Sequence, residues 1–582
     1  MDHQDLPKPQ AKRLCVLKFG SSVLGVEADY PAAALEVYRH VRDGEKVVAV
    51  VSALAGETDA LLDQASRVGG DAPGALVARL ARVGELQSAA LMALALSRVG
   101  VRAWAMDPHE MGLVAEGEPL DSDLTGLDSA ALLEKLDSYE VVVVPGFTAG
   151  HPEHGVVTLG RGGTDLSAVF FAARLDAHRV RLVKDVDGVY AEDPVANPNA
   201  ERYEQLDYAK AARVSAGLVQ PKAIHAAEIE DVLVEVAALG AAEATTISKV
   251  PERKSVHVKP AKLRVALLGC GAVGAGVLAH LRSRPELFEL NPVLVRNPSA
   301  HVEHARFTSD VEAALAHDPD LVIELIGGPD YAAELMSSAL RGGAHVVTAN
   351  KAALAKHYDT LEAAAQAGRS GFAYSGAVGG GTPILETLRR LKGEVVAIEG
   401  VMNGTANFLL SRLAEGCDFE EAVREAQALG FAEADPAADV DGHDAADKLS
   451  VLAREAFGVA LPPALIPRQS LRSLEPGAVR AALERGEALK QVGRCQLLPR
   501  GGIHAEVRLQ ALPLAHPLAG ARNEENRFLV RDSSGGVHEL YGKGAGRWPT
   551  AAAVFSDVMD VQRALACRAP QQAAAAPLLM RA

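Results

Sequence analysis

The chain has 582 residues, of which 48% are hydrophobic and 23% charged, with a formal net charge of -16. This length exceeds what one hydrophobic core usually supports, so we expect two or more domains. The dispersed negative charge argues against a nucleic-acid surface, and no run of about 18 apolar residues predicts a membrane span or a leader. The five cysteines form no CxxC or Cys/His motif, so we expect no disulfide framework, no zinc site and a cytoplasmic location.

Short β-branched runs alternate with helical windows between Arg13 and Ile247. The runs are VLKFG, VVAVVSA, VVVVPGF and VRLVKDVDGVY. This alternation is typical of a largely parallel sheet covered by helices.

Three motifs in this first region are suited to phosphate chemistry. Lys18 ends a predicted strand and precedes Gly20 and Ser21, GRGGTDLSA (160–168) opens a helix, and KDVDGVY (184–190) follows a strand. Glycine turns let backbone N–H groups approach a phosphate, and carboxylates suit Mg²⁺. Each motif alone is also typical of an ordinary turn, but the three in this order favour nucleotide binding.

The first 245 residues or so resemble the amino-acid kinase family, aspartokinases in particular. The resemblance is carried by KFGSS, VVSALAGETDALL, VGELQSAALMA, VVPGFTAG, GRGGTDLSA, KDVDGVYAEDP and QPKAIHAAE. It implies ATP with Mg²⁺, charge neutralisation by Lys18 and Arg161, and a site organised by Asp165. It further implies that aspartate is held by Ser52, Thr58 and Glu85, and that the residues near ATP are Gly20, Ser21, Asp185, Tyr190 and Lys222.

Two departures from the aspartokinase pattern keep alternatives open. The first motif reads KFGSSVL where aspartokinases read KFGGTS, which is closer to the glutamate 5-kinase relatives, and Lys184 stands where relatives carry threonine. The acyl acceptor is therefore aspartate or another acid such as glutamate. An inactive kinase-like module with a structural role is the remaining alternative.

A second strand and helix series follows the charged segment 248–262, which we interpret as a linker or an edge extension. It opens with LRVALLGCGAVGAG and continues through NPVLVRN, DLVIELIGG and HVVTANK. A GxGxxG between a strand and a helix predicts dinucleotide binding. Arg296 ends the second strand where an NAD site would have an acidic residue, so we expect NADP(H), with NAD as the alternative.

The stretch GFAEADPAADVDGHDAADK (430–448) gathers carboxylates and one ammonium where a loop enters a helix. Such a loop is often a solvated face, and it lacks the EF-hand calcium spacing. Residues 262 to 565 resemble homoserine dehydrogenase, which implies that Glu433, Asp439 and Asp444 bind the substrate and that Lys448 is the proton donor. Lys351 would lie beside both substrate and cofactor. The cofactor-binding residues by this resemblance are Gly269, Gly271, Ala272, Val273, Gly274, Arg296, Gly327, Lys351, Gly404, Gly430 and Gly544.

The same resemblance implies a sodium ion in the loop SGAVGGGTP. Its ligands would be Ser375, Val378, Gly380 and Thr382, although Ser375 replaces the usual glutamate. The ion therefore stays an open expectation.

We expect a three-layer α/β kinase-type domain followed by a Rossmann-type domain with an α+β substrate and dimerisation domain. The expected boundaries are 13–247 for the kinase domain, 248–262 for the linker, 263–395 for the nucleotide-binding domain, 396–540 for the catalytic domain, 541–565 for a return to the nucleotide-binding domain and 566–582 for a tail.

The expected activities are phosphorylation of L-aspartate and reduction of L-aspartate 4-semialdehyde to L-homoserine, steps towards threonine, methionine and lysine. The expected partners are small-molecule substrates and further copies of the chain, as a dimer or tetramer. No room is visible between Ile247 and Leu263 or after Val561 for an ACT-type regulatory domain, so we expect no feedback inhibition by lysine or threonine.

Overall fold

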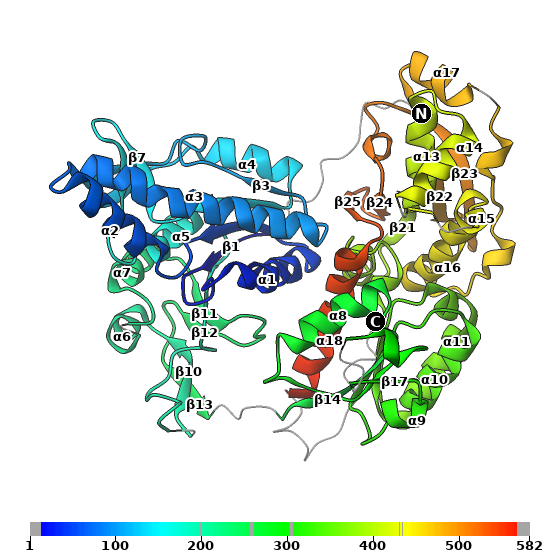
Figure 1. Ribbon diagram of the computed structural model, residues 1–582, viewed down its shortest axis with the longest axis horizontal. Coiled ribbons are helices and arrows are strands. Elements are labelled where there is room, and N and C mark those ends of the chain that lie inside the picture. Colours follow the sequence, from blue (N-terminus) through cyan, green and yellow to red (C-terminus); the bar gives the residue numbers. More distant parts are fainter. Residues whose placement is uncertain are drawn as a thin grey trace. The chain divides into compact units, whose positions relative to one another are not determined.

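The computed structural model describes residues 13–197, 199–215, 217–256, 261–302, 306–429, 431–432, 435–475 and 477–566 (Figure 1). The predicted tail lies outside these residues from 567 onward. The chain divides into two compact units, the first ending at residue 259 and the second beginning at residue 260.

A nine-stranded sheet forms the centre of the first unit, in the order β13-β10-β12-β11-β9-β1-β2-β6-β3. The pairs from β11 to β3 are all parallel, and their valine-rich strands are buried because helices cover both faces. The strands are β1 (Leu14–Phe19), β2 (Lys46–Val51), β3 (Ala103–Ala105), β6 (Val141–Pro145), β9 (Val180–Lys184), β10 (Glu201–Leu206), β11 (Val234–Ala238), β12 (Thr245–Ile247) and β13 (Arg253–Val256).

Helices and a second, smaller sheet complete this unit. The small sheet has the order β5-β4-β7-β8, with β4 (Val114–Glu118), β5 (Asp121–Gly126), β7 (Thr148–His151) and β8 (Gly155–Thr158). The helices are α1 (Tyr30–Arg42), α2 (Glu57–Gly69), α3 (Gly74–Arg98), α4 (Ser129–Ser138), α5 (Gly163–Arg174), α6 (Tyr208–Val214) and α7 (Pro221–Glu230).

The large sheet continues past residue 247, where we predicted its domain to end. Strand β13 lies within the predicted linker and pairs antiparallel with β10. Part of this segment is therefore an edge extension of the sheet, which was the second of our two interpretations of 248–262. Periodicity could not reveal this, because a four-residue edge strand with two charged residues is too short and too polar to show an alternating apolar pattern.

The second unit begins with a seven-stranded parallel sheet in the order β17-β16-β14-β18-β19-β20, with β15 beside β14. Its strands are β14 (Leu263–Leu268), β15 (Phe288–Leu290), β16 (Val293–Leu294), β17 (Phe307–Thr308), β18 (Leu321–Glu324), β19 (His345–Thr348) and β20 (Phe372–Ala373). Its helices are α8 (Ala272–Arg282), α9 (Val311–Ala314), α10 (Asp330–Arg341), α11 (Lys351–Gly368) and α18 (Arg547–Ala566).

An antiparallel sheet with its own helices follows in the same unit. The sheet has the order β23-β22-β21-β24-β25, with β21 (Val395–Val401), β22 (Glu487–Leu497), β23 (Ile503–Pro513), β24 (Glu525–Asp532) and β25 (Val537–Lys543). The helices are α12 (Ile384–Arg390), α13 (Gly404–Ala414), α14 (Phe419–Ala428), α15 (Ala437–Val440), α16 (His443–Phe457) and α17 (Ala478–Glu484).

The chain returns to the nucleotide-binding sheet through α18, which lies along α8 (Figure 1). The two helices approach so closely that a Cβ on Gly276 would lie 2.8 Å from that of Ala551. The return begins after β25, which ends at Lys543, whereas we predicted it to begin at residue 541.

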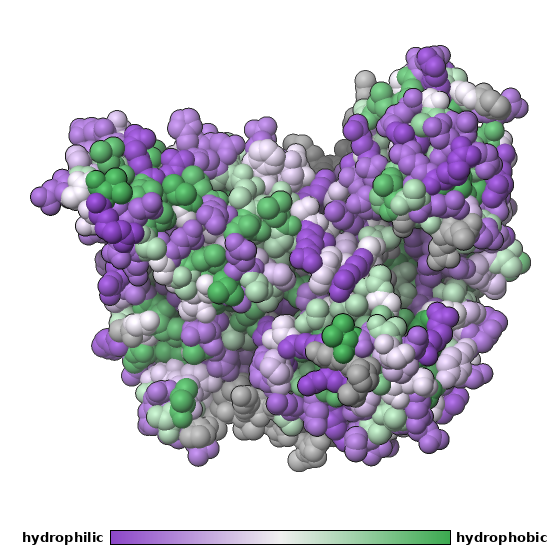
Figure 2. All heavy atoms as spheres, in the orientation of Figure 1, coloured by the Kyte–Doolittle hydropathy of each residue, from purple (hydrophilic) through white to green (hydrophobic). Residues whose placement is uncertain are grey.

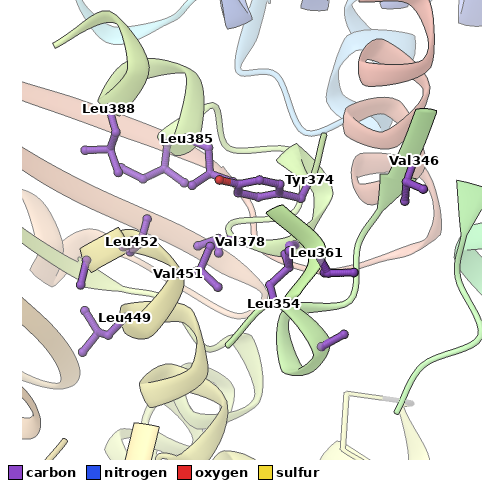
Figure 3. Close-up of a cluster of buried hydrophobic side chains, with 14 of the residues drawn as sticks. Val346, Leu354, Leu361, Tyr374, Val378, Leu385, Leu388, Leu449, Val451 and Leu452 are labelled. Atoms are coloured by element: carbon purple, nitrogen blue, oxygen red, sulfur yellow. The ribbon is translucent and has the colours of Figure 1, made fainter. Parts of the chain in front are cut away.

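One hydrophobic core joins the two parts of the second unit (Figure 3). It contains Val346 from β19, Leu354 and Leu361 from α11, and Leu449 and Leu452 from α16. This packing fixes the rotation of α16 and so positions the side chains of its first turns. The mixed α/β fold with a Rossmann-type domain is confirmed.

No helix among the described residues is both long and apolar enough to cross a membrane.

Candidate active sites

A cavity of about 540 Å³ lies at the carboxyl ends of β1, β2 and β9 in the first unit. Ligands of open α/β sheets commonly bind at this edge. Nine of the predicted site residues line the cavity together: Lys18, Gly20, Ser21, Ser52, Thr58, Glu85, Arg161, Asp165 and Asp185.

The polar centre of the cavity is Asp165, held between two lysines. Its carboxylate lies 2.7 Å from the Lys18 ammonium and 3.1 Å from that of Lys184. Burial alone would raise the pKa of Asp165, but the two ammonium groups lower it below its usual value. Lys18 aligns with Leu182 across β1 and β9, so Lys18 and Lys184 project from the same face of the sheet. Helix α5 packs on that face and brings Asp165 between them.

Glycines let the backbone approach this cluster closely. Gly160 and Gly162 have left-handed φ angles of 67° and 81°, and the first residues of α5 open into the cavity. A Cβ on Gly20 would lie 2.4 Å from the Lys18 nitrogen. The N-terminus of α5 and the lysines together are suited to binding an anion.

A buried carboxyl group lies on another wall of the cavity. Glu85, on α3, is 2% exposed. One of its carboxyl oxygens has no hydrogen-bond partner among the described residues, and neither does the Ser52 hydroxyl. Burial raises the pKa of Glu85 to about 8. A desolvated acid with one unpartnered oxygen facing a cavity is suited to binding a cationic group of a ligand.

Two residues predicted to lie near ATP do not line the cavity. Lys222 instead pairs with Asp123 of β5 at 2.7 Å, and the Tyr190 hydroxyl donates to Asp187 at 2.8 Å. The motif that carries each residue is adjacent to the cavity, since Asp185 and Gln220 line it.

In the second unit, the glycines of GCGAVG make the predicted dinucleotide turn. Gly269 has a φ of 101°, and a Cβ there would lie 2.5 Å from the Leu325 carbonyl oxygen. A Cβ on Gly274 would lie 2.1 Å from the Gly269 oxygen, whereas one on Gly271 would meet nothing within 4 Å. Ala272 and Val273 form the first turn of α8. The turn therefore leaves open space at Gly271, where a pyrophosphate could approach the helix N-terminus.

Residues at the ends of neighbouring strands surround this turn. Arg296 is exposed two residues beyond β16, whose Leu294 carbonyl accepts a bond from the Gly269 amide. Gly327 follows β18 in a left-handed conformation with φ of 75°. The buried Glu324 carboxylate accepts bonds from the amides of Ile326 and Gly327 and from the Thr348 hydroxyl, and so fixes this loop.

A second aspartate between two lysines lies at the start of α16. Asp444 is 2.7 Å from the Lys448 nitrogen and 2.9 Å from that of Lys351. Burial alone would raise the pKa of Asp444, but the two lysines hold it well below its usual range. Asn403 donates to Asp444 at 2.7 Å and to Asp439 at 2.6 Å. Lys448 is also bound to the carbonyl of Met402 at 2.5 Å, which directs its nitrogen.

Two other predicted residues, Glu433 and Gly430, lie outside the described residues. Gly404 and Gly544 are described. Gly404 begins α13 directly after Asn403, and a Cβ on Gly544 would lie 2.2 Å from the Asn526 side chain.

The loop predicted to bind sodium contacts α18. The Ser375 amide and hydroxyl both donate to the Asp557 carboxylate at 2.7 Å. Val378 is fully buried, and Gly380 has a φ of 58° with no room for a Cβ beside the Lys543 carbonyl. The Thr382 hydroxyl is buried without a hydrogen-bond partner among the described residues.

Sequence reasoning missed Asn403, Glu324 and the role of Lys184. Asn403 directly precedes the start of α13 and Glu324 ends a strand, so their positions at element ends were a usable signal. Lys184 was visible as an unusual residue, but only the structure reveals its contact with Asp165.

A third polar cluster lies at the opposite, amino edge of the first unit's sheet. Cys15, His40 and Glu45 bring their ligand atoms within 4.8 Å of one another, although their sequence spacing resembles no metal motif. The Arg179 guanidinium binds both Glu45 oxygens at 2.9 Å, and His40 lies 2.6 Å from the same carboxylate. Because a guanidinium already occupies the carboxylate, we interpret the cluster as a buried ion-pair network.

Family models match both units of the chain. The amino acid kinase family model matches residues 13–234, the NAD binding domain model of homoserine dehydrogenase matches 269–375, and the homoserine dehydrogenase model matches 383–559. The homoserine dehydrogenase of Corynebacterium glutamicum is 36% identical over 320 residues, which cover 51% of this chain and 72% of that protein. The homoserine dehydrogenase of Lactococcus lactis is 34% identical over 318 residues, which cover 51% of this chain and 74% of that protein.

A solved homoserine dehydrogenase from Thiobacillus denitrificans is 34% identical, with a TM-score of 0.51. The match covers 54% of this chain and 76% of that one. The chain therefore belongs to the homoserine dehydrogenase family, and an amino acid kinase family domain precedes the dehydrogenase in the same polypeptide.

Proposed function

We propose that the first unit transfers a phosphoryl group from ATP to the side-chain carboxylate of L-aspartate, giving 4-phospho-L-aspartate. The second unit acts as an NADPH-dependent reductase that converts L-aspartate 4-semialdehyde to L-homoserine. Both reactions belong to the synthesis of amino acids derived from aspartate, namely threonine, methionine and lysine.

The observation that carries the kinase proposal is the single cavity with cations around Asp165 and a buried acid, Glu85, on another wall. A substrate carboxylate is already a nucleophile, so transfer requires positioning and charge neutralisation more than a strong base. Lys18 and Arg161 neutralise the negative charge on the oxygens of the transferred phosphoryl group. Ionised Glu85 receives the ammonium of aspartate.

ATP with Mg²⁺ fits the residues present. The N-terminus of α5 and the glycine turns at Gly160 and Gly162 provide amides for phosphate oxygens, and Asp185 provides an exposed carboxylate at the cavity edge. Bound Mg²⁺ would neutralise charge on the phosphate chain during transfer.

An ATP-dependent hydroxamate assay tests this proposal, with aspartate and glutamate offered separately. Aspartyl hydroxamate as the main product is the expected result. Glutamyl hydroxamate as the main product would mean that glutamate, and not aspartate, is the acyl acceptor. No hydroxamate from either acid would favour the inactive module.

In the dehydrogenase, bound NADPH would supply hydride to the aldehyde carbon, so that negative charge would develop on the aldehyde oxygen. Lys448 protonates that oxygen, since its ammonium is held at a fixed position by Asp444 and the Met402 carbonyl. Lys351 adds a second positive charge beside the substrate and the cofactor. Asp439, bound to Asn403, accepts hydrogen bonds from the substrate's polar groups.

We propose NADP(H) as the preferred cofactor because Arg296 is exposed beyond β16, next to the strand that leads into the glycine turn. A guanidinium there would pair with a 2′-phosphate. Comparing NADPH and NADH as reductants tests this preference.

A sodium ion fits the loop 375–382. The buried Thr382 hydroxyl and Asn526 amide make no hydrogen bonds within the described part of the chain, and the Asp557 carboxylate lies at the start of the loop. Carbonyl oxygens of Ser375, Val378, Gly380 and Thr382 would hold the ion and fix the loop. Dependence of the dehydrogenase rate on Na⁺ against a choline control measures the effect.

We also propose that the chain forms a homodimer through α3. Leu76, Val83 and Leu94 are exposed on this helix, and Figure 2 shows hydrophobic residues gathered over α2 and α3. With Leu80, Gln87 and Ala90 they form a stripe at alternating spacings of four and three residues, symmetric about position 85. Two copies packed antiparallel would therefore align residue 76 with 94 and residue 83 with 87. Sedimentation of the Leu76→Glu/Leu94→Glu variant should give a smaller species than wild type.

A further inference from the structure

The polar centre of the kinase cavity carries more buried positive than negative charge. Lys18, Lys184 and Asp165 are 6%, 7% and 4% exposed, so two ammonium groups face one carboxylate. The other buried acid, Glu85, is largely protonated at neutral pH because burial raises its pKa to about 8. An uncompensated buried charge is costly, and an anionic ligand is the natural compensation.

Lys184 occupies this centre, whereas Lys222, the lysine that we expected near ATP, does not. The Lys184 ammonium lies 3.1 Å and 3.3 Å from the two Asp165 oxygens and lines the cavity. Lys222 is bound to Asp123. Lys184 and Lys18 project from neighbouring strands on the same face, so an anion beside Asp165 could contact both ammonium groups at once.

We propose that Lys184 is a catalytic residue of the kinase unit, which together with Lys18 binds the oxygens of the transferred phosphoryl group. The inference rests on the proposed kinase function. In that reaction the acceptor carboxylate oxygen forms a bond to the γ-phosphorus, and the bond from this phosphorus to the bridging oxygen breaks, with its electron pair leaving on ADP. The two lysines stabilise the charge on the moving group, and Asp165 holds both ammonium groups in position.

The test compares Lys184→Met and Lys184→Arg with Lys210→Met, a control on α6 whose lysine pairs with Glu252 and does not line the cavity. We expect Lys184→Met to lower kcat for hydroxamate formation about 100-fold, as loss of a charged transition-state contact does, with little change in KM for the acceptor. Lys184→Arg should recover part of the rate, and Lys210→Met should match wild type. Unchanged kcat in Lys184→Met, accompanied only by a lower melting temperature, would mean that Lys184 is merely a structural partner of Asp165.

A binding measurement separates this inference from the choice of acceptor. Calorimetry with Mg²⁺ and a non-hydrolysable ATP analogue, and separately with ADP, requires no acceptor. We expect Lys184→Met to weaken binding of the ATP analogue at least tenfold and binding of ADP by less, since Lys184 would contact the terminal phosphoryl group. If wild type makes hydroxamate from glutamate and none from aspartate, yet shows this difference, the inference stands and the aspartate proposal fails. If the variant binds both nucleotides as wild type does, or wild type binds neither, the inference is overturned.

Discussion

The two units contain the same local arrangement, one buried aspartate between two lysines, in different electrostatic surroundings. In the kinase unit Asp165 pairs with Lys18 and Lys184 at 2.7 and 3.1 Å. In the dehydrogenase unit Asp444 pairs with Lys448 and Lys351 at 2.7 and 2.9 Å. The distances alone do not distinguish the two chemistries.

The surrounding charges do distinguish them. In the kinase cavity two lysines face one carboxylate, and burial together with the neighbouring Lys18 lowers the pKa of Lys184. The pKa of Lys351 is raised, first by Asp444 and further by Asp447 and Asp439, so carboxylates dominate at the second site. The first cluster is therefore suited to a phosphate and the second to a substrate with an ammonium group.

Removing the proton donor should give the largest change. Lys448→Met should lower kcat for NADPH oxidation with aspartate semialdehyde by about 10² to 10⁴, the usual contribution of a general acid. The hydroxamate rate of the same preparation is the control and should not change. A dehydrogenase rate within a few-fold of wild type would remove Lys448 from the mechanism.

Removing the matching lysine of the kinase should give a somewhat smaller change. Lys18→Met should lower hydroxamate formation by about 10² to 10³, the range for loss of one group that stabilises transition-state charge. NADPH oxidation serves as the internal control for folding. A kinase that retains its rate without Lys18 would contradict the phosphoryl-binding role of the cluster.

Glu85→Gln should weaken acceptor binding and remove a pH dependence. Loss of a charged contact should raise KM for aspartate about 10- to 100-fold. In wild type, kcat/KM should rise with pH up to about 8, the pKa of buried Glu85, because the ionised form binds the ammonium.

The same residue should affect stability in the opposite direction. Its folded pKa is above its unfolded value near 4.5, so its contribution is complete below the unfolded value and is lost as pH rises through about 8. Denaturant titrations of wild type between these pH values should show the free energy of unfolding decline. The Glu85→Gln variant should lack the part of this decline that comes from Glu85. An identical decline in both proteins would show that Glu85 is not the titrating group.

Arg296→Ser should give the smallest effect, since this side chain is exposed. We expect the Kd for NADPH to rise about tenfold, the worth of one solvent-accessible charge-assisted contact, with no change for NADH. Fluorescence titration of both cofactors measures this. Equal weakening of NADPH and NADH would mean that Arg296 supports the loop and does not select the 2′-phosphate.

Much of the fold followed from local pattern in the sequence. Buried parallel strands such as β2 and β6 have continuous valine runs, and the glycine turn before α8 has a fixed spacing, so both could be predicted. The edge strand β13 has no such signal. Two of its four residues are charged, and only pairing with β10 makes them a strand.

The sites were predictable as sets of residues but not as contacts. Lys18, Asp165, Asp444 and Lys448 all stood in recognisable motifs. The partners Lys184 and Asn403 depend on which faces of strands and helices meet, and this is set by tertiary packing. For the same reason the sequence could not reveal that Lys222 pairs with Asp123 of the small sheet.

If one chain carries two separate active sites, each built on its own aspartate, the two activities should be lost independently. The most direct test measures both activities, hydroxamate formation from aspartate and NADPH oxidation with aspartate semialdehyde, in wild type, Asp165→Asn and Asp444→Asn. We predict that Asp165→Asn loses the first activity and keeps the second, and that Asp444→Asn does the reverse. Hydroxamate formation that survives in Asp165→Asn, or loss of both activities in either folded variant, would contradict the account.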